Sequence, residues 1–573
     1  MKNLMLSAAL GLGLVACGGA SDPATSDAPT DIATADIAPE DVTLPPITAE
    51  EIDRYMQVLA SDEFEGRAPA TAGGRKTRAY LIEQMQEIGL LPANGDSYEQ
   101  AVGLVEQTLL PNRSSLTLSM PDATTRPLTF GAETVFWSKQ VKEEISFDDS
   151  ELVYVGFGIV APEYGWDDYA GVDVTDKTVV ILVNDPGFYL EDEAFTGKAM
   201  TYYGRWTYKY EEAARQGAAG AIIVHETDPA AYGWGVVEGS WSGPQLDLQR
   251  ANDGADRTEL EGWITLDVAN ELFAAAGMDY AAEKQAALSG TFQAKPMAGI
   301  TASAELKNVI NRSESANVAG VLKGTKSPDD FVLYMAHWDH LGKSFAAIGG
   351  GDGSGDTINN GAVDNATGTA GLLAIADSFA KADTPPERSM IFVAVTAEES
   401  GLLGSAYFAE RPLVPFEQII GGINMDALRP SSPSKDITVI GYGKSELEDV
   451  LTEVAESYGK YIRPDPSPEK GSFYRSDHIS LAKKGVPMLY ASKGIDLIEG
   501  GEEAGRAFAD AYTADRYHKP ADNYGEDWDL RGLVETFTIL RDTGKELAYS
   551  DIVPNWYEGD EFKALRDEQL ARR

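Results

Sequence analysis

The chain has 573 residues, of which 43% are hydrophobic, and its 91 acidic and 47 basic residues give a formal charge of −44 at pH 7. This length exceeds one ordinary domain, so two or more domains are expected. The acidic balance argues against a nucleic-acid partner, because a phosphate backbone repels a surface of its own sign. It favours a soluble body in an external or periplasmic setting.

The N-terminus has the pattern of an export signal. MKNLMLSAALGLGLVAC places Lys2 before an apolar stretch that is too short to span a membrane. The stretch ends in LVAC, which resembles the lipobox of bacterial lipoproteins, where the signal is cut before a lipidated cysteine. We therefore expect residues 1–16 to be a lipoprotein signal peptide and Cys17 to be lipidated, in an exported protein that is periplasmic or anchored to the outer membrane. An ordinary secretory signal or a soluble periplasmic form stays open.

A tether follows the signal. Residues 17–47 are low in hydrophobicity, rich in Ser, Asp, Pro and Thr, and without periodicity, so we expect them to be disordered. Cys17 is the only cysteine, so no intrachain disulfide can form and no thiol is left for catalysis once it is lipidated.

Helices are predicted where the tether ends. Thr48 and Glu51 fit a capping box. Behind this box, apolar residues recur at helical spacing, at Ile52, Tyr55, Met56 and Leu59. A second helix is predicted from Leu81, Met85 and Ile88, and short strand-like runs begin near residue 100.

The segment from 143 to 296 has a different pattern of apolar residues. VYVGFGI, TVVILVN and AAGAIIVH are short apolar runs typical of strands, and a helical stretch around YKYEEAARQG precedes the last of them. The stretches from GFGIV to VNDPG and from EEAARQG to AIIV resemble the protease-associated (PA) domain that is inserted in several peptidase families. We expect a smaller inserted β-rich α/β domain here. The alternative is that the segment belongs to one larger α/β sheet.

From residue 297 onward, apolar strands alternate with helical stretches: FVLYMA, GLLAIADSFA, IFVAV, IIGGINM, DITVIGY and PMLYAS appear in turn. This alternation predicts an α/β domain with a mixed, largely parallel sheet covered by helices. Active sites in such sheets lie outside the carboxyl ends of the strands.

Candidate metal ligands follow these strands or lie in one late loop. His337 follows FVLYMA, Asp364 lies in NGAVDNATG, Glu399 follows IFVAV, Asp426 follows IIGGINM, and His518 lies in RYHKPADNY. Each residue alone has a plain structural role, such as a helix cap or a solvated face. Together at one sheet edge they favour a metal site, and imidazoles mixed with carboxylates suit Zn²⁺ better than Mg²⁺ or Ca²⁺.

The ordered motifs HWDHLG, NGAVDNATGTAGLL, TAEESGLLGS, NMDA and YHKPADNY resemble those of the M28 family of co-catalytic zinc exopeptidases. The resemblance covers roughly the last half of the chain and the N-terminal helices. It implies a peptidase domain whose first part is residues 48–142 and whose second part, residues 297–573, holds the metal site.

The resemblance also implies a ligand set for two zinc ions. Asp364 bridges the ions, His337 and Asp426 complete one site, and Glu399 and His518 complete the other.

It further implies distinct roles for the adjacent glutamates. Two zinc ions about 3.5–4 Å apart share a water and lower its pKa. With Glu399 taken as a ligand, Glu398 is placed to accept the proton of this water and to return it to the leaving amine.

Three more residues receive expected roles around the metal ligands. Asp339 is placed to orient His337, and Asp522 to orient His518. Tyr517 could donate a hydrogen bond to the oxyanion of the reaction, although a packed aromatic residue fits the pattern as well.

The favoured activity is that of an aminopeptidase, which removes N-terminal residues from peptides with a metal-bridged hydroxide. A glutaminyl cyclase shares the fold but uses one zinc, and the presence of His337 beside Asp339 argues against it. A carboxypeptidase needs a basic cluster for the terminal carboxylate, and only Arg475 is an obvious candidate. A fourth possibility is a non-catalytic binding module, but non-catalytic relatives lose metal ligands, whereas all five predicted ligands and Glu398 are present here. The expected partners are peptide substrates, and contact with a membrane is expected only through the lipid anchor.

Replacing Cys17 with serine should abolish lipid labelling and leave the precursor uncleaved by the lipoprotein-specific peptidase, because the acyl chain is attached through the thiol. Metabolic labelling with a fatty acid, together with the mass of the mature N-terminus, measures both effects. Labelling that persists in the variant would contradict the assignment of the anchor.

Overall fold

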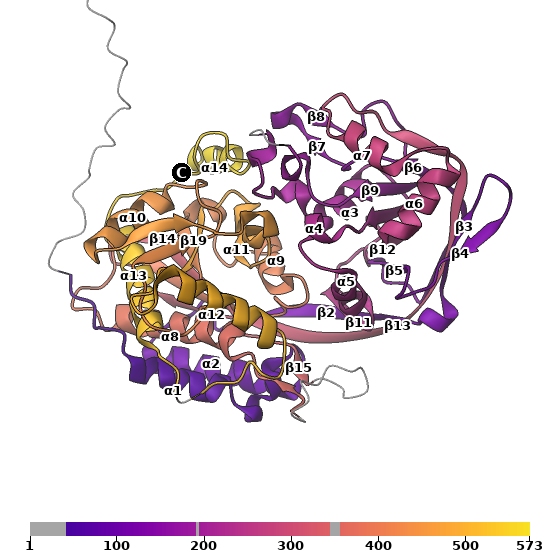
Figure 1. Ribbon diagram of the computed structural model, residues 1–573. Helices are drawn as coiled ribbons and strands as arrows, with labels where there is room; N and C mark the ends of the chain where they lie inside the picture. Colours follow the sequence, from indigo (N-terminus) through magenta and orange to yellow (C-terminus); the bar gives the residue numbers. More distant parts are fainter. Residues whose placement is uncertain (1–41, 191–193, 344–355, 526) are drawn as a thin grey trace, which may run out of the picture.

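The computed structural model describes residues 42–190, 194–343, 356–525 and 527–573, so the predicted signal peptide, most of the tether and Cys17 lie outside the described residues. The chain forms two lobes, each with its own sheet and hydrophobic core (Figure 1). We call residues 42–110 and 307–573 the first lobe and residues 111–306 the second lobe. Strand β13 (Lys295–Leu322) takes part in both sheets and joins them.

The sheet of the first lobe has a parallel centre. β14 (Ser327–His337) lies between β17 (Arg388–Val395) and β18 (Ile419–Asn424), and β21 (Met488–Lys493) extends the parallel set. β13 pairs antiparallel with β17. The central strands are buried along almost their whole length, which explains their continuous apolar runs. The predicted mixed, largely parallel sheet is confirmed.

Shorter or antiparallel strands complete the two edges of this sheet. Beyond β13 lie β2 (Glu99–Leu109) and β11 (Pro244–Leu248), β1 (Leu91–Pro92) pairs with the end of β13, and beyond β21 lie β19 (Asp436–Val439) and β20 (Tyr461–Pro464).

Helices cover both faces of the first sheet. The larger core involves α1 (Ala49–Leu59), α2 (Ala72–Ile88), α8 (Thr367–Ala380), α10 (Leu447–Ser457) and α13 (Arg531–Ala548). The opposite face is covered by α9 (Leu403–Glu410) and α11 (His478–Ala482), and α12 (Gly501–Asp515) and α14 (Lys563–Leu570) complete the lobe. Within the described ranges, no helix is both long and apolar enough to cross a membrane.

The first predicted helix begins as its sequence indicates. The Thr48 hydroxyl accepts a hydrogen bond from the Glu51 backbone N–H at 3.2 Å, which caps the N-terminus of α1. The residues on the predicted apolar face are all buried: Ile52, Tyr55, Met56 and Leu59. This face packs against α8 beneath the sheet, so local pattern and tertiary packing agree.

The second lobe has its own sheet. β6 (Glu144–Tyr154), β9 (Thr178–Leu182), β10 (Gly220–Val224) and β12 (Leu260–Ile264) are parallel neighbours in that order. The edges are formed by β13 with β3 (Ser115–Ser119) and β4 (Thr125–Pro127), and by β5 (Thr134–Trp137) beside β12. A separate small hairpin pairs β7 (Val160–Ala161) with β8 (Trp166–Asp167).

Helices cover the second sheet as well, and they are α3 (Trp206–Arg215), α4 (Thr227–Ala230), α5 (Trp234–Trp241), α6 (Leu266–Ala275) and α7 (Tyr280–Ala287). Alternate residues of β9 belong to two different buried clusters, one on each face. The core also takes in Leu116, Leu118 and Leu306, which lie outside the predicted segment 143–296. The resemblance of this segment to a PA domain stays a prediction.

The lobes also meet away from β13. The Met200 N–H donates to the Pro468 carbonyl at 3.3 Å, and the Lys483 ammonium donates to the Tyr202 hydroxyl at 2.5 Å. The rings of Tyr202 and Tyr474 lie 5.9 Å apart. The second lobe therefore contacts the segment 468–483 of the first lobe.

Excision of the second lobe should succeed only if the cut respects its core. The Leu110 N–H donates to the Lys307 carbonyl at 2.8 Å, so the two ends of the first lobe are adjacent. Deleting residues 111–306 with a short glycine linker should leave a soluble, folded first lobe whose sheet lacks only the edge strand β11. Deleting only 143–296 should give an aggregating product, because Leu116, Leu118 and Leu306 would lose the partners that bury them. Gel filtration and circular dichroism compare the two deletion variants. A folded product from the deletion of 143–296 and an aggregating one from the deletion of 111–306 would contradict this division of the core.

Candidate metal centre

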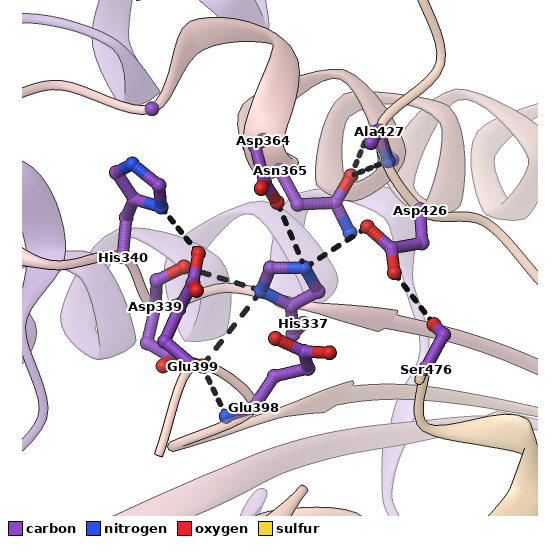
Figure 2. Close-up of polar contacts among 12 residues, drawn as sticks. His337, Asp339, His340, Asp364, Asn365, Glu398, Glu399, Asp426, Ala427 and Ser476 are labelled. Atoms are coloured by element: carbon purple, nitrogen blue, oxygen red, sulfur yellow. Dashed lines mark hydrogen bonds and ion pairs between the residues drawn. The ribbon is translucent and has the colours of Figure 1, made fainter. Parts of the chain in front are cut away.

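The predicted ligands meet at one edge of the first sheet. His337 ends β14, while Glu398 and Glu399 follow β17 and Asp426 follows β18. Asp364 lies in the short helix η8 (Ala362–Ala366) that leads into α8. Figure 2 shows the carboxylates gathered around the His337 imidazole. The carboxyl ends of parallel strands bring these side chains together, as the topology requires.

Asp364 lies between two imidazoles. The His337 Nε2 is 3.3 Å from Asp364 Oδ1 and 3.1 Å from Asp426 Oδ1. The His518 Nε2 is 3.4 Å from Asp364 Oδ2 and 3.1 Å from Glu399 Oε2. Each oxygen of Asp364 therefore faces a different histidine, and each histidine has a second carboxylate of its own. The structure brings the five residues together in two groups; that they bind metal stays a prediction.

The two adjacent glutamates have opposite electrostatic environments. Burial favours protonation of Glu399, but the His518 and His340 rings outweigh it and hold the pKa of Glu399 at about 2. Burial, with the carboxylates of Asp426 and Glu399, raises the pKa of Glu398 well above its usual range. Glu399 is thus held as a carboxylate, whereas Glu398 takes up a proton more readily than a free glutamate, so the two can perform different chemical tasks.

The chemistry of the cluster fits divalent cations. The donor atoms of His337, Asp364 and Asp426 all lie within 4.8 Å of one another, as do those of His340, Asp364 and Glu399. In the described structure the buried Oδ2 of Asp339 has no hydrogen-bond partner. Buried carboxylates are costly unless they are paired or coordinate a metal. Bound cations would supply the partner that the Asp339 carboxylate and its neighbours lack.

Asp339 contacts His337 mainly through its backbone. Its carbonyl oxygen lies 3.2 Å from the His337 Nδ1, whereas its carboxylate oxygen is 3.9 Å away. The same carboxylate accepts a hydrogen bond from the Glu398 N–H at 3.1 Å. Asp339 therefore links the first imidazole to the glutamate pair, which goes beyond its expected role.

Asp522 is placed differently from the expectation that it orients His518. Its carboxylate accepts hydrogen bonds from the backbone N–H groups of Val363 and Asp364, each at 3.1 Å. It also accepts a hydrogen bond from the Tyr512 hydroxyl at 3.3 Å. No hydrogen bond joins it to His518 within the described ranges. The N–H groups at the start of η8 need an acceptor, and the Asp522 carboxylate supplies it. Asp522 thus positions the loop of Asp364.

Three contacting residues were not assigned from the sequence. The His340 Nδ1 lies 2.5 Å from Glu399 Oε1, and the Ser476 hydroxyl donates to Asp426 Oδ2 at 2.6 Å. The Asn365 amide donates to the Met425 carbonyl at 3.0 Å and its oxygen accepts from the Ala427 N–H at 3.2 Å (Figure 2). His340 and Asn365 lie inside the motifs HWDHLG and NGAVDNATG, and Ser476 follows Arg475, but their contacts join distant loops and leave no local pattern.

Tyr517 lies beside the second group. Its ring stacks on that of His518, with centroids 3.8 Å apart at 26°. Burial raises the pKa of Tyr517 well above its usual range, so the hydroxyl keeps its proton. No hydrogen bond joins this hydroxyl to another described residue, which leaves its proton available to a ligand. Its role as a donor to an oxyanion stays a prediction.

Two arginines from different lobes interact electrostatically, and one of them, Arg475, also interacts with Glu398. The Nε of Arg205, in the second lobe, is buried without a hydrogen-bond partner. Burial and the positive charge of Arg475 lower the pKa of Arg205 to about 10, so the two guanidinium groups interact across the lobes. Arg475 in turn interacts with Tyr517 and Glu398. Of the ion pairs among the described residues, none includes either arginine.

Parts of the chain are similar to known peptidases. It is 35% identical over 114 residues to the Mus musculus protein "Aminopeptidase NAALADL1", which covers 19% of this chain and 13% of that protein. It is 26% identical over 152 residues to "Leupeptin-inactivating enzyme 1" of Streptomyces exfoliatus, which covers 26% of this chain and 33% of that enzyme. The chain thus matches a third or less of the length of these relatives.

Solved structures also resemble the chain. An aminopeptidase from Aneurinibacillus sp. strain AM-1 aligns with a TM-score of 0.49 at 18% identity, over 89% of this chain and 96% of that one. BSAP, a zinc aminopeptidase from Bacillus subtilis, aligns with a TM-score of 0.41 at 17% identity, over 91% of this chain and 100% of that one.

The family comparison falls on the lobe that carries the site. Residues 317–541 match the model of peptidase family M28. This range includes all five predicted ligands and Glu398, and it begins in β13 and ends in α13. The similarity to peptidase family M28 therefore falls on the part of the first lobe that carries the candidate metal ligands.

Proposed function

We propose that the protein is a zinc-dependent exopeptidase of the aminopeptidase type that uses two zinc ions. The observation that carries the proposal is the position of Asp364, whose two oxygens face His337 and His518 at 3.3 and 3.4 Å. With Asp426 and Glu399, these residues would hold the ions. The match of residues 317–541 to the model of peptidase family M28 supports the same activity.

The residues of the chain then divide the chemistry of peptide hydrolysis. When bound, the zinc ions would polarise the attacking water and the scissile carbonyl. Glu398 accepts the proton of the water as its oxygen bonds to the carbonyl carbon, and it returns the proton to the amine as the C–N bond breaks. The protonated Tyr517 hydroxyl donates a hydrogen bond to the oxyanion of the tetrahedral intermediate. The raised pKa of Glu398 fits a group that must hold a proton between two steps.

Export of the protein as a lipoprotein is part of the proposal. The support is the LVAC sequence at Cys17 and the polar segment that follows it. Such an anchor would place the metal centre outside the inner membrane, on a tether, where its substrates would be extracytoplasmic peptides.

A second candidate activity is supported by the two arginines. A carboxypeptidase must bind the terminal carboxylate of its substrate, and a guanidinium pair suits this group. The sequence offered only Arg475 for this purpose, whereas the fold adds the buried Arg205 of the second lobe, which interacts with the charge of Arg475. Removal of a C-terminal residue is therefore the alternative to be tested.

A substrate panel separates the two activities. Aminoacyl anilides, which have a free amine and no carboxylate, should be cleaved, and N-acylated dipeptides should not, because the proposed enzyme acts at the N-terminus. A chelator should abolish turnover and added zinc should restore it. Cleavage of the N-acylated dipeptides, with a KM raised by Arg475→Ala but not by the exposed control Arg113→Ala, would establish the carboxypeptidase. Turnover that resists the chelator would refute the zinc mechanism.

The two glutamates should respond differently to substitution. Glu398→Gln keeps the shape of the side chain but cannot accept a proton, so turnover should fall by about 10²–10⁴-fold while the zinc content stays near wild type. Glu399→Ala removes a predicted ligand and should lower both zinc content and turnover. Metal analysis paired with steady-state rates measures this, with the exposed Glu410→Gln as control. Loss of zinc in Glu398→Gln and its retention in Glu399→Ala would reverse the assignment.

A further inference from the structure

A buried arginine lies directly behind the metal centre. Arg67 ends the short helix η1 (Asp62–Arg67), and its side chain is 1% exposed. Within the described structure its guanidinium forms no ion pair, and it donates its hydrogen bonds to backbone carbonyls. A buried cation bound only by neutral carbonyls is uncommon, since buried charges are usually paired. The carbonyls that Arg67 binds belong to the loops that carry the predicted metal ligands.

The guanidinium joins the two loops that carry the first ligands. Its Nε donates to the Trp338 carbonyl at 2.9 Å, directly after His337. Its Nη1 donates to the Asn360 carbonyl at 2.5 Å and its Nη2 to the Gly361 carbonyl at 2.8 Å, just before the loop of Asp364. The rigid, planar arrangement of N–H donors therefore fixes the distance between both loops.

A further hydrogen bond ties the same group to the N-terminal helices. The Nη1 also donates to the Leu59 carbonyl at 2.6 Å, at the end of α1. The Asn360 side chain donates to Asp62 at 2.7 Å and to Asn523 at 2.8 Å. The segment around η1 thus holds the Asp364 loop through the main chain and through side chains.

The backbone of η1 has an unfavourable conformation at the residues that place the Arg67 side chain against the two loops. Glu65, Gly66 and Arg67 have φ values of 53°, 68° and 52°, in the left-handed region that non-glycine residues rarely occupy. A Cβ on Gly66 would lie 2.4 Å from the Asn359 carbonyl, so the segment packs directly on the loop before Asp364. Such outliers persist where the surrounding structure requires them, commonly beside functional sites.

The positive charge of Arg67 lies close to the carboxylates of the candidate metal centre. Burial lowers the pKa of Arg67 to about 10, and the nearby carboxylates of Asp339 and Asp522 oppose the shift, so the group is charged at neutral pH. It supplies a fixed positive charge on the protein side of a cluster of carboxylates. This charge offsets part of their mutual repulsion.

We propose that Arg67 is a positioning residue for the metal centre, which sets the separation of the His337 and Asp364 loops and thereby the affinity of the cluster for zinc. This inference rests on the proposed function only in that the ligands bind zinc. It assigns a role in metal affinity to the N-terminal region, outside the range 317–541 that matches the family model.

The test compares two buried arginines. Arg388 is 5% exposed and likewise donates to backbone carbonyls, those of Leu547 and Ile552 at 2.8 and 2.6 Å, but it lies at the opposite end of β17 from the glutamates. Arg67→Lys and Arg388→Lys both replace the planar donor set with a single ammonium. Both should lower the unfolding midpoint of the metal-free chain.

Only Arg67→Lys should weaken zinc binding, by about 10–100-fold in a competition titration with a chromophoric chelator, a range typical of residues that orient metal ligands. At saturating zinc it should lower kcat with little change in KM. Equal zinc affinity in wild type and Arg67→Lys would overturn the proposal, as would equal losses in both lysine variants.

A milder variant covers the case in which Arg67→Lys does not fold. Asp62→Ala removes an exposed carboxylate that accepts from Asn360 and keeps the arginine. It should lower zinc affinity several-fold without changing the unfolding midpoint, and an unchanged affinity would then overturn the proposal. A wild-type chain that binds zinc but cleaves no peptide would refute the proposed activity, while the affinity comparison would still decide the role of Arg67.

Discussion

A buried carboxylate stays ionised only beside positive charge or strong hydrogen-bond donors, and Asp364 meets this condition from two sides. Burial opposes its ionisation, but the hydrogen bonds from the His337 and His518 rings hold its pKa well below the usual range. The surrounding structure is arranged so that one carboxylate can face both rings. If either ring moved, Asp364 would lose the partner of one oxygen, and the division into two groups would disappear.

Much of the precision of the site comes from backbone groups. The N–H groups of η8 are held by the Asp522 carboxylate, and the Glu398 N–H by that of Asp339. The carbonyls of the loops before and after are held by Arg67 and Asn365. Side chains that bind the main chain of another loop fix its position more firmly than contacts between flexible side chains would, because fewer torsions intervene.

The sequence predicted the helices, the strands and the polar residues at the strand ends, which depend on local pattern. It did not predict the contacts between loops that are distant in the chain. The buried face of α1, the parallel strands and the polar residues at their ends follow from periodicity and strand topology. The direction of the Asp522 carboxylate does not, since it depends on unsatisfied N–H groups about 160 positions earlier in the chain. Arg205 lies in a segment without a catalytic motif, and only the packing of the second lobe brings it near Arg475.

The continuity of β13 has a mechanical consequence. A ribbon of β2 and β13, with β11 paired along part of β2, connects the lobes, because β13 passes from one sheet into the other as a single strand. Such a ribbon resists extension, since stretching it breaks ladder hydrogen bonds, but it yields to bending and twisting. A change in the angle between the lobes would therefore be a flexure spread along the strands, limited by the contact of Tyr202 with Lys483.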